Sequence, residues 1–340
     1  MRPLRLGFIG LGHITVKSHL PALLPHVAAG EAVLQAFCDV DAAVLEEQAA
    51  AFGVARTYTD HHAMFEREEL DAVYLCIPPT LHTDAELIAA ERGIALFVEK
   101  PQTLDLGQAV AFEKAIRKAG IVSQVGFMTR YYPAADRVRE ILAERIPRHA
   151  NVQLLYSGAP IRYWTSRFEL CGGSFVENTI HTIDFLRYLY GDIALVSAFY
   201  LDRKPGEERG PMNLPHAYLV NYRFANGVAA QATTSRCLTD AGVSKWEVLL
   251  VSEGSLIDWS SRRILENGQV IWEDPAPTNP FAAQATAFLQ AVRRGDPGAV
   301  KSPYSEALNS LAAVLGANES AARGGELVRI EEFLRQSSGE

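Results

Sequence analysis

Residues 1–127 alternate between short apolar runs and amphipathic helical patterns, and this alternation constrains the fold more than any other feature. The apolar runs have the length of strands and lie at Leu6–Gly10, Ala32–Cys38, Asp71–Ile77, Ala95–Val98 and Ile121–Phe127. Helical patterns such as Thr83–Arg92 and Leu106–Lys118 separate them. Strands that alternate with helices build βαβ units with right-handed crossovers. We therefore expect an α/β domain with a doubly wound parallel sheet over residues 1–127.

The first apolar run breaks into a glycine turn, Gly10-Leu-Gly12, and a helical pattern follows. Gly10 permits a tight turn, Gly12 lets the backbone approach a pyrophosphate, and the helix amino terminus attracts its charge. Thr15 stands where a third glycine is usual, so a tight turn without a ligand is the alternative. We expect a Rossmann dinucleotide site that includes His13 and Ile14.

Other residues are expected to border this site. Asp39 ends the second apolar run, where an acid hydrogen-bonds the adenosine ribose of NAD and repels the extra phosphate of NADP. No arginine follows Asp39 directly, so we expect NAD, with NADP as the alternative. Asp41 is expected to cap the next helix. Pro78 and Pro79 turn the chain over the cofactor, and His82 is expected to support that loop.

The triplet Glu99-Lys100-Pro101 follows the run Ala95–Val98, which we expect to be the fifth strand of the sheet. Ligands bind open α/β sheets outside the carboxyl ends of the strands. Lys100 at such an end can reach a bound cofactor and a substrate together. The alternative is a lysine that pairs with Glu99 on the surface.

The pattern changes from residue 151 onward. The runs are now β-rich or alternating, at Val152–Tyr156, Leu195–Leu201, Ala217–Phe224, Val228–Thr234 and Trp246–Val251. Ala225-Asn226-Gly227 indicates a hairpin, and helices are expected over Pro280–Arg294 and Tyr304–Ala322. We expect residues 128–340 to form an α+β domain with a large, mainly antiparallel, open-faced sheet, whose C-terminal helices can pack back on the first domain.

A second cluster of chemically useful residues begins at Gly172-Gly173, which precede a helix that we expect to end at Gly191. Glu177, His181 and Asp184 stand at i, i+4 and i+7, on one stripe of an otherwise apolar helix. A histidine between two acids suits a pocket in which a carboxylate orients the imidazole. The alternatives are a hydrogen-bonded histidine on a partly buried helix and, for Asp184, an inward structural hydrogen bond.

Composition and charge exclude several classes of function. The 340 residues carry a formal net charge of -8, which disfavours nucleic acid and anionic membrane surfaces as partners. The four cysteines are widely spaced and are expected to be reduced, mostly buried thiols. No apolar stretch resembles a signal peptide or a membrane span, so we expect a cytoplasmic protein. His61-His62 is an adjacent pair that should point to different sides of a helix, so we expect surface or cap residues and no metal site.

Taken together, these motifs resemble the glucose–fructose oxidoreductase, inositol dehydrogenase and rhizopine-catabolism (Gfo/Idh/MocA) family. The resemblance rests on Gly10-Leu-Gly12, Asp39, Pro79-Thr80-x-His82, Glu99-Lys100-Pro101, Gly126-Phe-x-x-Arg130, Gly172-Gly173 and the spacing from Glu177 to His181. It covers nearly the whole chain. It implies an N-terminal Rossmann domain and a C-terminal domain with an open antiparallel sheet.

The resemblance also implies an NAD(P)-dependent oxidoreductase that acts on a hydroxyl or carbonyl of a sugar, polyol or cyclitol. Lys100 would lie beside the nicotinamide and the substrate, and His181 would transfer the proton. Glu177 stands where the family usually has aspartate, which adds one methylene. Beyond the catalytic residues, we expect cofactor contacts from Glu99 and substrate contacts from Arg130, Arg162, Tyr163, Trp164 and Asp184.

Two other functions fit the same cofactor domain: a non-catalytic NAD(P)-binding sensor, and a nicotinamide enzyme without net redox, such as a glycosidase. The joint presence of Lys100 and His181 favours the dehydrogenase. We also expect a homodimer or homotetramer, because the strands Ala217–Phe224 and Val228–Thr234 carry apolar residues on both faces.

Overall fold

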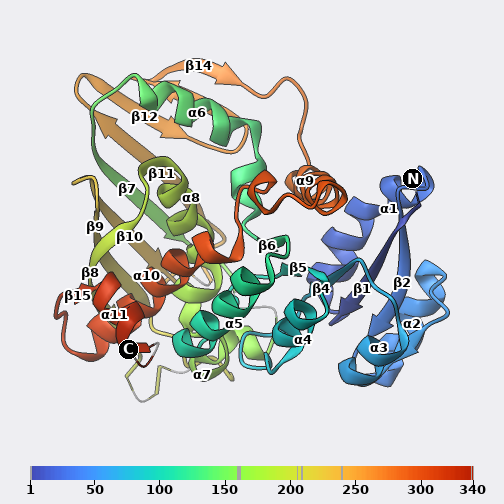
Figure 1. The fold of residues 1–340 in the computed structure, drawn as a ribbon. Coiled ribbons are helices and arrows are strands. Elements are labelled where there is room, and N and C mark those ends of the chain that lie inside the picture. The colour runs from blue at the N-terminus through green and yellow to red at the C-terminus, as the bar shows by residue number, and fades with distance from the viewer. Residues whose placement is uncertain are drawn as a thin grey trace. The chain divides into compact units, whose positions relative to one another are not determined.

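The computed structural model describes residues 2–158, 162–204, 206–207, 210–238, 240–337 and 339. The chain forms two compact units (Figure 1). Unit 1 comprises Met1–Thr103, Gln108–Met128 and Asn279–Glu306. Unit 2 comprises Leu104–Gly107, Thr129–Thr278 and Ala307–Glu340. The chain therefore leaves unit 1 after Met128 and returns to it over Asn279–Glu306.

Unit 1 contains the parallel sheet that the alternating pattern predicted. Its strands are β1 (Leu4–Ile9), β2 (Ala32–Cys38), β3 (Thr57–Tyr58), β4 (Ala72–Leu75), β5 (Ala95–Val98) and β6 (Ser123–Val125), in the order β3-β2-β1-β4-β5-β6. All neighbouring strands are parallel. Its helices are η1 (Thr15–His19), α1 (Leu20–Ala28), α2 (Ala42–Phe52), α3 (His61–Arg67), α4 (Ala85–Glu91), most of α5 (Leu106–Ala119), α9 (Pro280–Arg294) and η5 (Pro297–Ala299).

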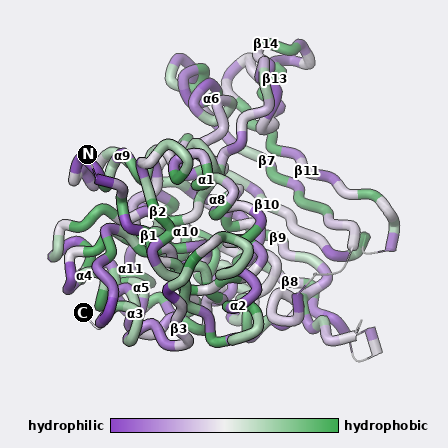
Figure 2. The backbone as a smooth tube through the Cα atoms, turned by 90° about the vertical axis from the view of Figure 1, so that its right-hand side faces the viewer, coloured by the Kyte–Doolittle hydropathy of each residue, from purple (hydrophilic) through white to green (hydrophobic). Residues whose placement is uncertain are grey.

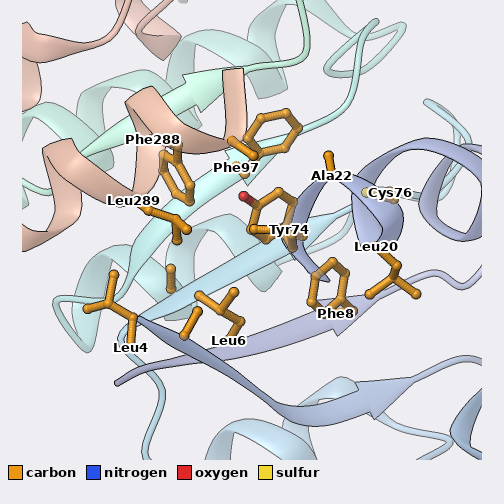
Figure 3. Packing of buried hydrophobic residues seen from close by; sticks show 14 of the residues in the cluster. Leu4, Leu6, Phe8, Leu20, Ala22, Tyr74, Cys76, Phe97, Phe288 and Leu289 are labelled. Carbon is orange, nitrogen blue, oxygen red and sulfur yellow. The ribbon is translucent and has the colours of Figure 1, made fainter. Parts of the chain in front are cut away.

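The core of unit 1 is a set of aromatic rings that neighbouring strands bring together (Figure 3). Phe8 of β1 stacks on Tyr74 of β4 at 4.9 Å between ring centroids, and Tyr74 stacks on Phe97 of β5 at 4.6 Å. Phe288 of α9 packs edge-on against Tyr74 and Phe97. These rings are almost fully buried and fix the three strands whose carboxyl ends carry the candidate cofactor residues.

Unit 2 contains a mixed, mainly antiparallel sheet of nine strands. These are β7 (Pro147–Leu155), β8 (Ile193–Leu201), β9 (Ala217–Phe224), β10 (Ala229–Ser235), β11 (Lys245–Ser252), β12 (Ser255–Trp259), β13 (Arg263–Glu266), β14 (Gln269–Glu273) and β15 (Val328–Arg329). Their order is β14-β13-β12-β11-β7-β10-β9-β8-β15, and only β7 and β10 pair in parallel among the described strands. The predicted fold class is confirmed in both units.

Helices cover one face of this sheet. The helical elements are η2 (Met128–Tyr131), α6 (Pro133–Ala143), η3 (Trp164–Ser166), α7 (Phe168–Cys171), η4 (Phe175–Thr179), α8 (Ile180–Tyr190), α10 (Tyr304–Ala322) and α11 (Ile330–Ser337). Phe185 of α8 stacks on Trp259 of β12 at 4.0 Å, and the Trp259 indole donates to the Ala134 carbonyl of α6. From Tyr218 to Phe224, buried and exposed residues alternate along β9. Figure 2 shows hydrophobic and hydrophilic segments along the strands of this sheet.

Candidate active site

The glycine turn after β1 is built so that only glycine fits at position 10. Gly10 has a φ of +90°, and a Cβ atom there would lie 2.4 Å from the Cys76 carbonyl oxygen at the end of β4. Thr15, the departure from the usual third glycine, is fully buried, and its hydroxyl donates to the Gly10 carbonyl at 2.8 Å. The threonine therefore fastens the turn to the first helical residues.

The same turn leaves room for a dinucleotide. A Cβ atom at Gly12 would meet nothing within 4 Å, so the backbone is open to a close ligand at this point. His13 is exposed, whereas Ile14 is partly buried and packs against the core of unit 1. The helix begins at His13 and continues through the π turn η1 into α1, so the N–H groups of its first turn favour an anion here. The donor set fits a pyrophosphate.

Asp39 follows β2 and holds two backbone segments. One carboxylate oxygen accepts from the Leu11 N–H of the glycine turn at 2.7 Å, and the other accepts from the Asp41 N–H at 2.9 Å. Asp41 accepts from the N–H groups of Ala43 and Val44, so its predicted role as the cap of α2 is confirmed. Asp39 is thus fixed at the carboxyl edge of the sheet, beside the open glycine turn.

The loop after β4 contains three of the expected cofactor residues, Pro78, Pro79 and His82. Pro79 is buried and Pro78 is partly buried. His82 is buried, with its Nδ1 atom 2.5 Å from a carboxylate oxygen of Glu86, and its carbonyl accepts from Gln108 at 3.0 Å. These contacts hold the loop in place.

The carboxyl end of β5 carries a buried acid in front of the lysine. Glu99 is 7% exposed, lies 2.7 Å from the Nε2 atom of His19, and accepts from the Lys100 N–H at 3.0 Å. Its carboxylate also packs so closely on Gly126 that a Cβ atom there would lie 2.6 Å away. Glu99 is therefore an interior residue and not a surface acid. Lys100 itself is partly buried.

His19 is a residue that sequence reasoning missed. It ends the turn η1, is 2% exposed, and contacts the ring of Phe97 at 4.9 Å between centroids. No motif marks this position, because the partner Glu99 lies 80 residues away in the sequence. The contact between His19 and Glu99 can therefore be recognised only in the folded structure.

In unit 2, two glycines set the start of the second cluster. Gly172 and Gly173 have φ values of +72° and +91°. A Cβ atom at Gly173 would lie 2.8 Å from the Phe168 ring and 2.9 Å from the Tyr218 hydroxyl oxygen. That oxygen accepts from the Ser174 N–H at 3.0 Å, so the turn is packed against β9.

The helix that follows is not a regular α-helix. Residues Phe175–Thr179 form a π turn, and α8 continues to Tyr190 and ends at Gly191, as expected. A π turn widens the helix locally, and residues four apart still share a face of it, so the common stripe of Glu177 and His181 stays a prediction. Glu177 is 8% exposed and His181 is partly buried.

Asp184 lies in the interior of unit 2. Its two oxygens accept from Nε and a terminal nitrogen of Arg130, each at 2.7 Å, and the Ser310 hydroxyl donates to it at 2.7 Å. Arg130 is 2% exposed and Asp184 is fully buried. This geometry favours the inward structural bond over the expected substrate contact for both residues. It ties η2 to α8 and α10.

The expected aromatic segment before the glycines is only partly described, because residues 159–161 lie outside the described residues. Tyr163 is 65% exposed, and Arg162 is partly buried. Trp164 packs against a small cluster around Cys171. Tyr163 thus presents a flat apolar face to solvent, while Trp164 is anchored.

Arg236 is a second residue that sequence reasoning missed. It follows β10, is 7% exposed, donates to the Ser174 hydroxyl at 3.0 Å, and lies 4.4 Å from the centre of the Tyr156 ring. Burial raises the pKa of Tyr156 to about 12, against the lowering effect of Arg236. A single arginine after a strand carries no pattern in the sequence.

The cysteines supply no nucleophile in this region. All four thiols are free, and Cys38, Cys76 and Cys171 are buried, which confirms the predicted reduced, mostly buried state. Burial raises the pKa of Cys38 and of Cys171 to about 12. These thiols therefore stay protonated near neutral pH.

Unit 2 also contains an open cavity of about 840 Å³. Its lining includes Phe168, Tyr200, Asn318 and Phe333. The Asn318 amide donates to the Gly172 carbonyl at 3.0 Å and accepts from the Tyr200 hydroxyl at 2.7 Å. Asn318 thus connects the cavity lining to the glycine turn, and the described lining contains none of the expected site residues.

Family models and known proteins agree with this architecture. Residues 4–127 match the oxidoreductase family with an NAD-binding Rossmann fold, and residues 145–257 match the GFO/IDH/MocA C-terminal domain. The chain belongs to the Gfo/Idh/MocA family of oxidoreductases, and its N-terminal part is an NAD-binding Rossmann domain.

Among relatives, the chain is 33% identical over 197 residues to scyllo-inositol 2-dehydrogenase (NAD(+)) of Bacillus subtilis. That match spans 56% of each protein. It is 26% identical over 303 residues to D-xylose 1-dehydrogenase (NADP(+)) 2 of Haloferax volcanii, which spans 85% of this chain and 89% of the relative.

Among solved structures, levoglucosan dehydrogenase in complex with NADH and levoglucosan is similar in fold. It has a TM-score of 0.84 and 19% identity, and the match covers 97% of this chain and all of that one. In the described parts of this chain, no helix has the length and apolar character needed to cross a membrane.

Proposed function

We propose that the protein is an NAD-dependent dehydrogenase that transfers a hydride between nicotinamide and a carbinol or carbonyl carbon of a sugar, polyol or cyclitol. The observation that carries the proposal is the pair of contacts at the end of β5, where buried Glu99 contacts His19 and the Lys100 N–H. A lysine so fixed at the carboxyl edge of an NAD-binding sheet suits a reacting position. The names of the inositol and xylose dehydrogenases support the substrate class.

The proposed chemistry needs a proton acceptor and a cation. When bound, nicotinamide supplies the hydride acceptor. Loss of hydride leaves positive character on the carbinol carbon, so the hydroxyl proton must leave at nearly the same time. His181, neutral, accepts that proton, which is worth roughly a hundred- to ten-thousand-fold in rate. Lys100 hydrogen-bonds the same oxygen and stabilises the developing negative charge.

Glu177 and the aromatic segment would orient the substrate. Glu177 keeps the negative charge of the usual aspartate on a side chain one methylene longer, so it reaches further toward the imidazole or a substrate hydroxyl. The exposed ring of Tyr163 and the anchored Trp164 offer flat apolar walls to a sugar ring. Arg162 would grip hydroxyls or a carboxylate. Arg130 and Asp184 would instead position α8.

The remaining expected roles stay part of the proposal. Residues 1–127 would bind the cofactor and residues 128–340 the substrate and a second copy of the chain. Contacts to the cofactor would come from the glycine turn and the neighbouring loops: Gly10, Gly12, His13, Ile14, Asp39, Pro78, Pro79, His82, Glu99 and Lys100. NAD rather than NADP is favoured by the fixed carboxylate of Asp39.

We also propose a cytoplasmic location and a homodimer or homotetramer. The four free thiols support a reducing compartment. The oligomer is supported by Phe199, Leu201 and Leu219, which are exposed on neighbouring strands of the nine-stranded sheet.

A turnover assay that follows NADH absorbance, with a panel of sugars, polyols and inositols, tests the dehydrogenase. Wild-type protein is expected to turn over at least one panel member. Lys100→Met and His181→Gln are each expected to lower kcat at least about a hundredfold while NADH binding persists. Lys118→Ala, an exposed lysine at the end of α5, is the matched control and should keep full activity.

Two outcomes contradict the proposal. Tight NADH binding without turnover of any panel member indicates a sensor. Cleavage of a glycoside without net change in NADH indicates an enzyme without net redox.

A further inference from the structure

The adjacent pair His61-His62 begins helix α3, and its two rings lie together. The ring centroids are 4.1 Å apart with an angle of 34° between the planes. The expectation that the two side chains point to different sides of a helix is therefore wrong. Both rings occupy the first turn, where the cap residue Asp60 and the first residue before α4, Asp84, draw them to one side.

Asp84 fixes the protonation pattern of both imidazoles. Its Oδ1 atom lies 2.8 Å from Nε2 of His61, and its Oδ2 atom lies 2.9 Å from Nε2 of His62. An ionised carboxylate only accepts hydrogen bonds, so each neutral imidazole must carry its proton on Nε2. The lone pair of each ring is then on Nδ1.

Those lone pairs face a second carboxylate. The Oδ1 atom of Asp60 lies 3.0 Å from Nδ1 of His62 and 4.0 Å from Nδ1 of His61. One ligand atom from each of Asp60, His61 and His62 lies within 4.8 Å of the other two. A cation between these three donors, or a proton shared by His62 and Asp60, satisfies their lone pairs.

The donor set defines the class of cation. Two imidazole nitrogens and one carboxylate oxygen are ligands that Zn²⁺ accepts, with water in the fourth tetrahedral position. Zn–N bonds of about 2.0–2.1 Å place tetrahedral donors about 3.3 Å apart. The 3.0 Å separation already matches, and a small rotation of the His61 ring closes the 4.0 Å one. Asp60 and His62 are exposed and His61 is partly buried, so the ion can enter from solvent.

We propose that Asp60, His61 and His62 form a divalent transition-metal site of Zn²⁺ type, in which Asp84 orients both imidazoles. Hydrogen bonds from the far ring nitrogen to a carboxylate are the usual support of a metal-bound histidine. The ion would lie at the start of α3 within unit 1, and Asp84 before α4 would hold the two ligating imidazoles. The competitor is a proton: a protonated His62 can donate to Asp60 directly.

Isothermal titration of metal-free, full-length protein without a histidine tag tests this site, using Zn²⁺ at a pH slightly above neutral. Visible absorption of bound Co²⁺ reports the coordination geometry. We expect about one ion per chain and a tetrahedral Co²⁺ spectrum. The double variant His61→Gln/His62→Gln should weaken binding at least tenfold.

Asp84→Asn tests the orienting role, because an amide would donate to one imidazole and move its proton to Nδ1. This variant should bind Zn²⁺ about 10- to 100-fold more weakly. The matched control is His26→Gln, another histidine of unit 1, which lies 2.6 Å from Glu31. Absence of stoichiometric Zn²⁺ uptake overturns the proposal, as does an affinity in the double variant within twofold of wild type. A loss in His26→Gln equal to that in the double variant also overturns it.

Discussion

At position 15 a threonine replaces a glycine, and its hydroxyl supplies a bond that glycine cannot make. The buried Thr15 side chain donates to the carbonyl of Gly10, whose own position next to the Cys76 carbonyl leaves no room for a Cβ atom. Glycine is therefore required at position 10, because the backbone of Cys76 approaches closely there. Position 15 accepts threonine, because the buried hydroxyl has a hydrogen-bond partner. The two positions have different physical requirements despite belonging to one motif.

Asp39 determines cofactor choice if the proposed function holds. Asp39→Ala should lower NAD affinity and raise the ratio of NADP to NAD use at least tenfold, because the repulsion of the extra phosphate is removed. Asp41→Ala is the matched control, since Asp41 only caps α2. It should cost about 1 kcal/mol of stability and leave the ratio unchanged. The test is to measure the dissociation constants of NAD and NADP by fluorescence. An unchanged ratio of the two constants in Asp39→Ala contradicts the role of Asp39 in cofactor choice.

Sequence reasoning predicted the Asp41 cap, whose partners are sequence neighbours, and missed residues whose partners are distant. The Asp41 cap follows from a carboxylate just before a helical pattern, so it could be predicted. His19 and Arg236 carry no such local signal, because their contacts with Glu99 and Ser174 form only in the folded sheet. Asp184 has a local pattern, but its partner Arg130 lies 54 residues away.

Two π turns lie near the starts of helices, and each carries a residue of the candidate active site. One is η1, which carries His19 beside Glu99, and the other is η4, which carries Glu177. Elements with regular periods were predicted well: Ala32–Cys38, Ala95–Val98, Ala217–Phe224, Pro280–Arg294 and Tyr304–Ala322 have the observed bounds. A π turn shifts the hydrophobic pattern by one residue, and the short helical patterns here do not resolve such a shift. Two-residue strands such as β3 are too short to show any period.

The pair formed by Arg130 and Asp184 should dominate the stability of α8. Arg130→Met leaves a fully buried carboxylate without its cation and should lower the free energy of unfolding by about 3–5 kcal/mol. Arg130→Met/Asp184→Leu should recover part of that loss, since both charges are gone. Arg137→Met, an exposed pair with Glu140, is the control and should change stability by less than about 1 kcal/mol.

Urea unfolding followed by tryptophan fluorescence is the suitable measurement. All four tryptophans, at positions 164, 246, 259 and 272, belong to unit 2, so the signal reports this unit. A loss in Arg130→Met no larger than that in Arg137→Met would falsify the buried-pair argument.

At the scale of the whole molecule, the uncovered face of the nine-stranded sheet sets the expected assembly. Phe199 is 55% exposed and pairs across strands with Leu219, which is 38% exposed. Leu219→Asp should place a charge inside the proposed contact and dissociate the oligomer to monomers at micromolar concentration. Leu24→Asp, which alters an exposed leucine of α1, should leave the assembly intact.

Size-exclusion chromatography with light scattering measures the mass of both variants and of wild type. A wild-type monomer, or an unchanged mass in Leu219→Asp, rejects the use of this face.

The return of α9 to unit 1 has a consequence for how the protein is made. Phe288 and Leu289 are buried in the same core as Phe8 and Tyr74, although more than 200 residues of chain separate them. Before α9 has been synthesised, the aromatic rings over β4 and β5 remain uncovered and exposed to water. The amino-terminal half therefore completes its interior only when nearly nine-tenths of the polypeptide has been synthesised, and chains that end earlier should be prone to aggregation.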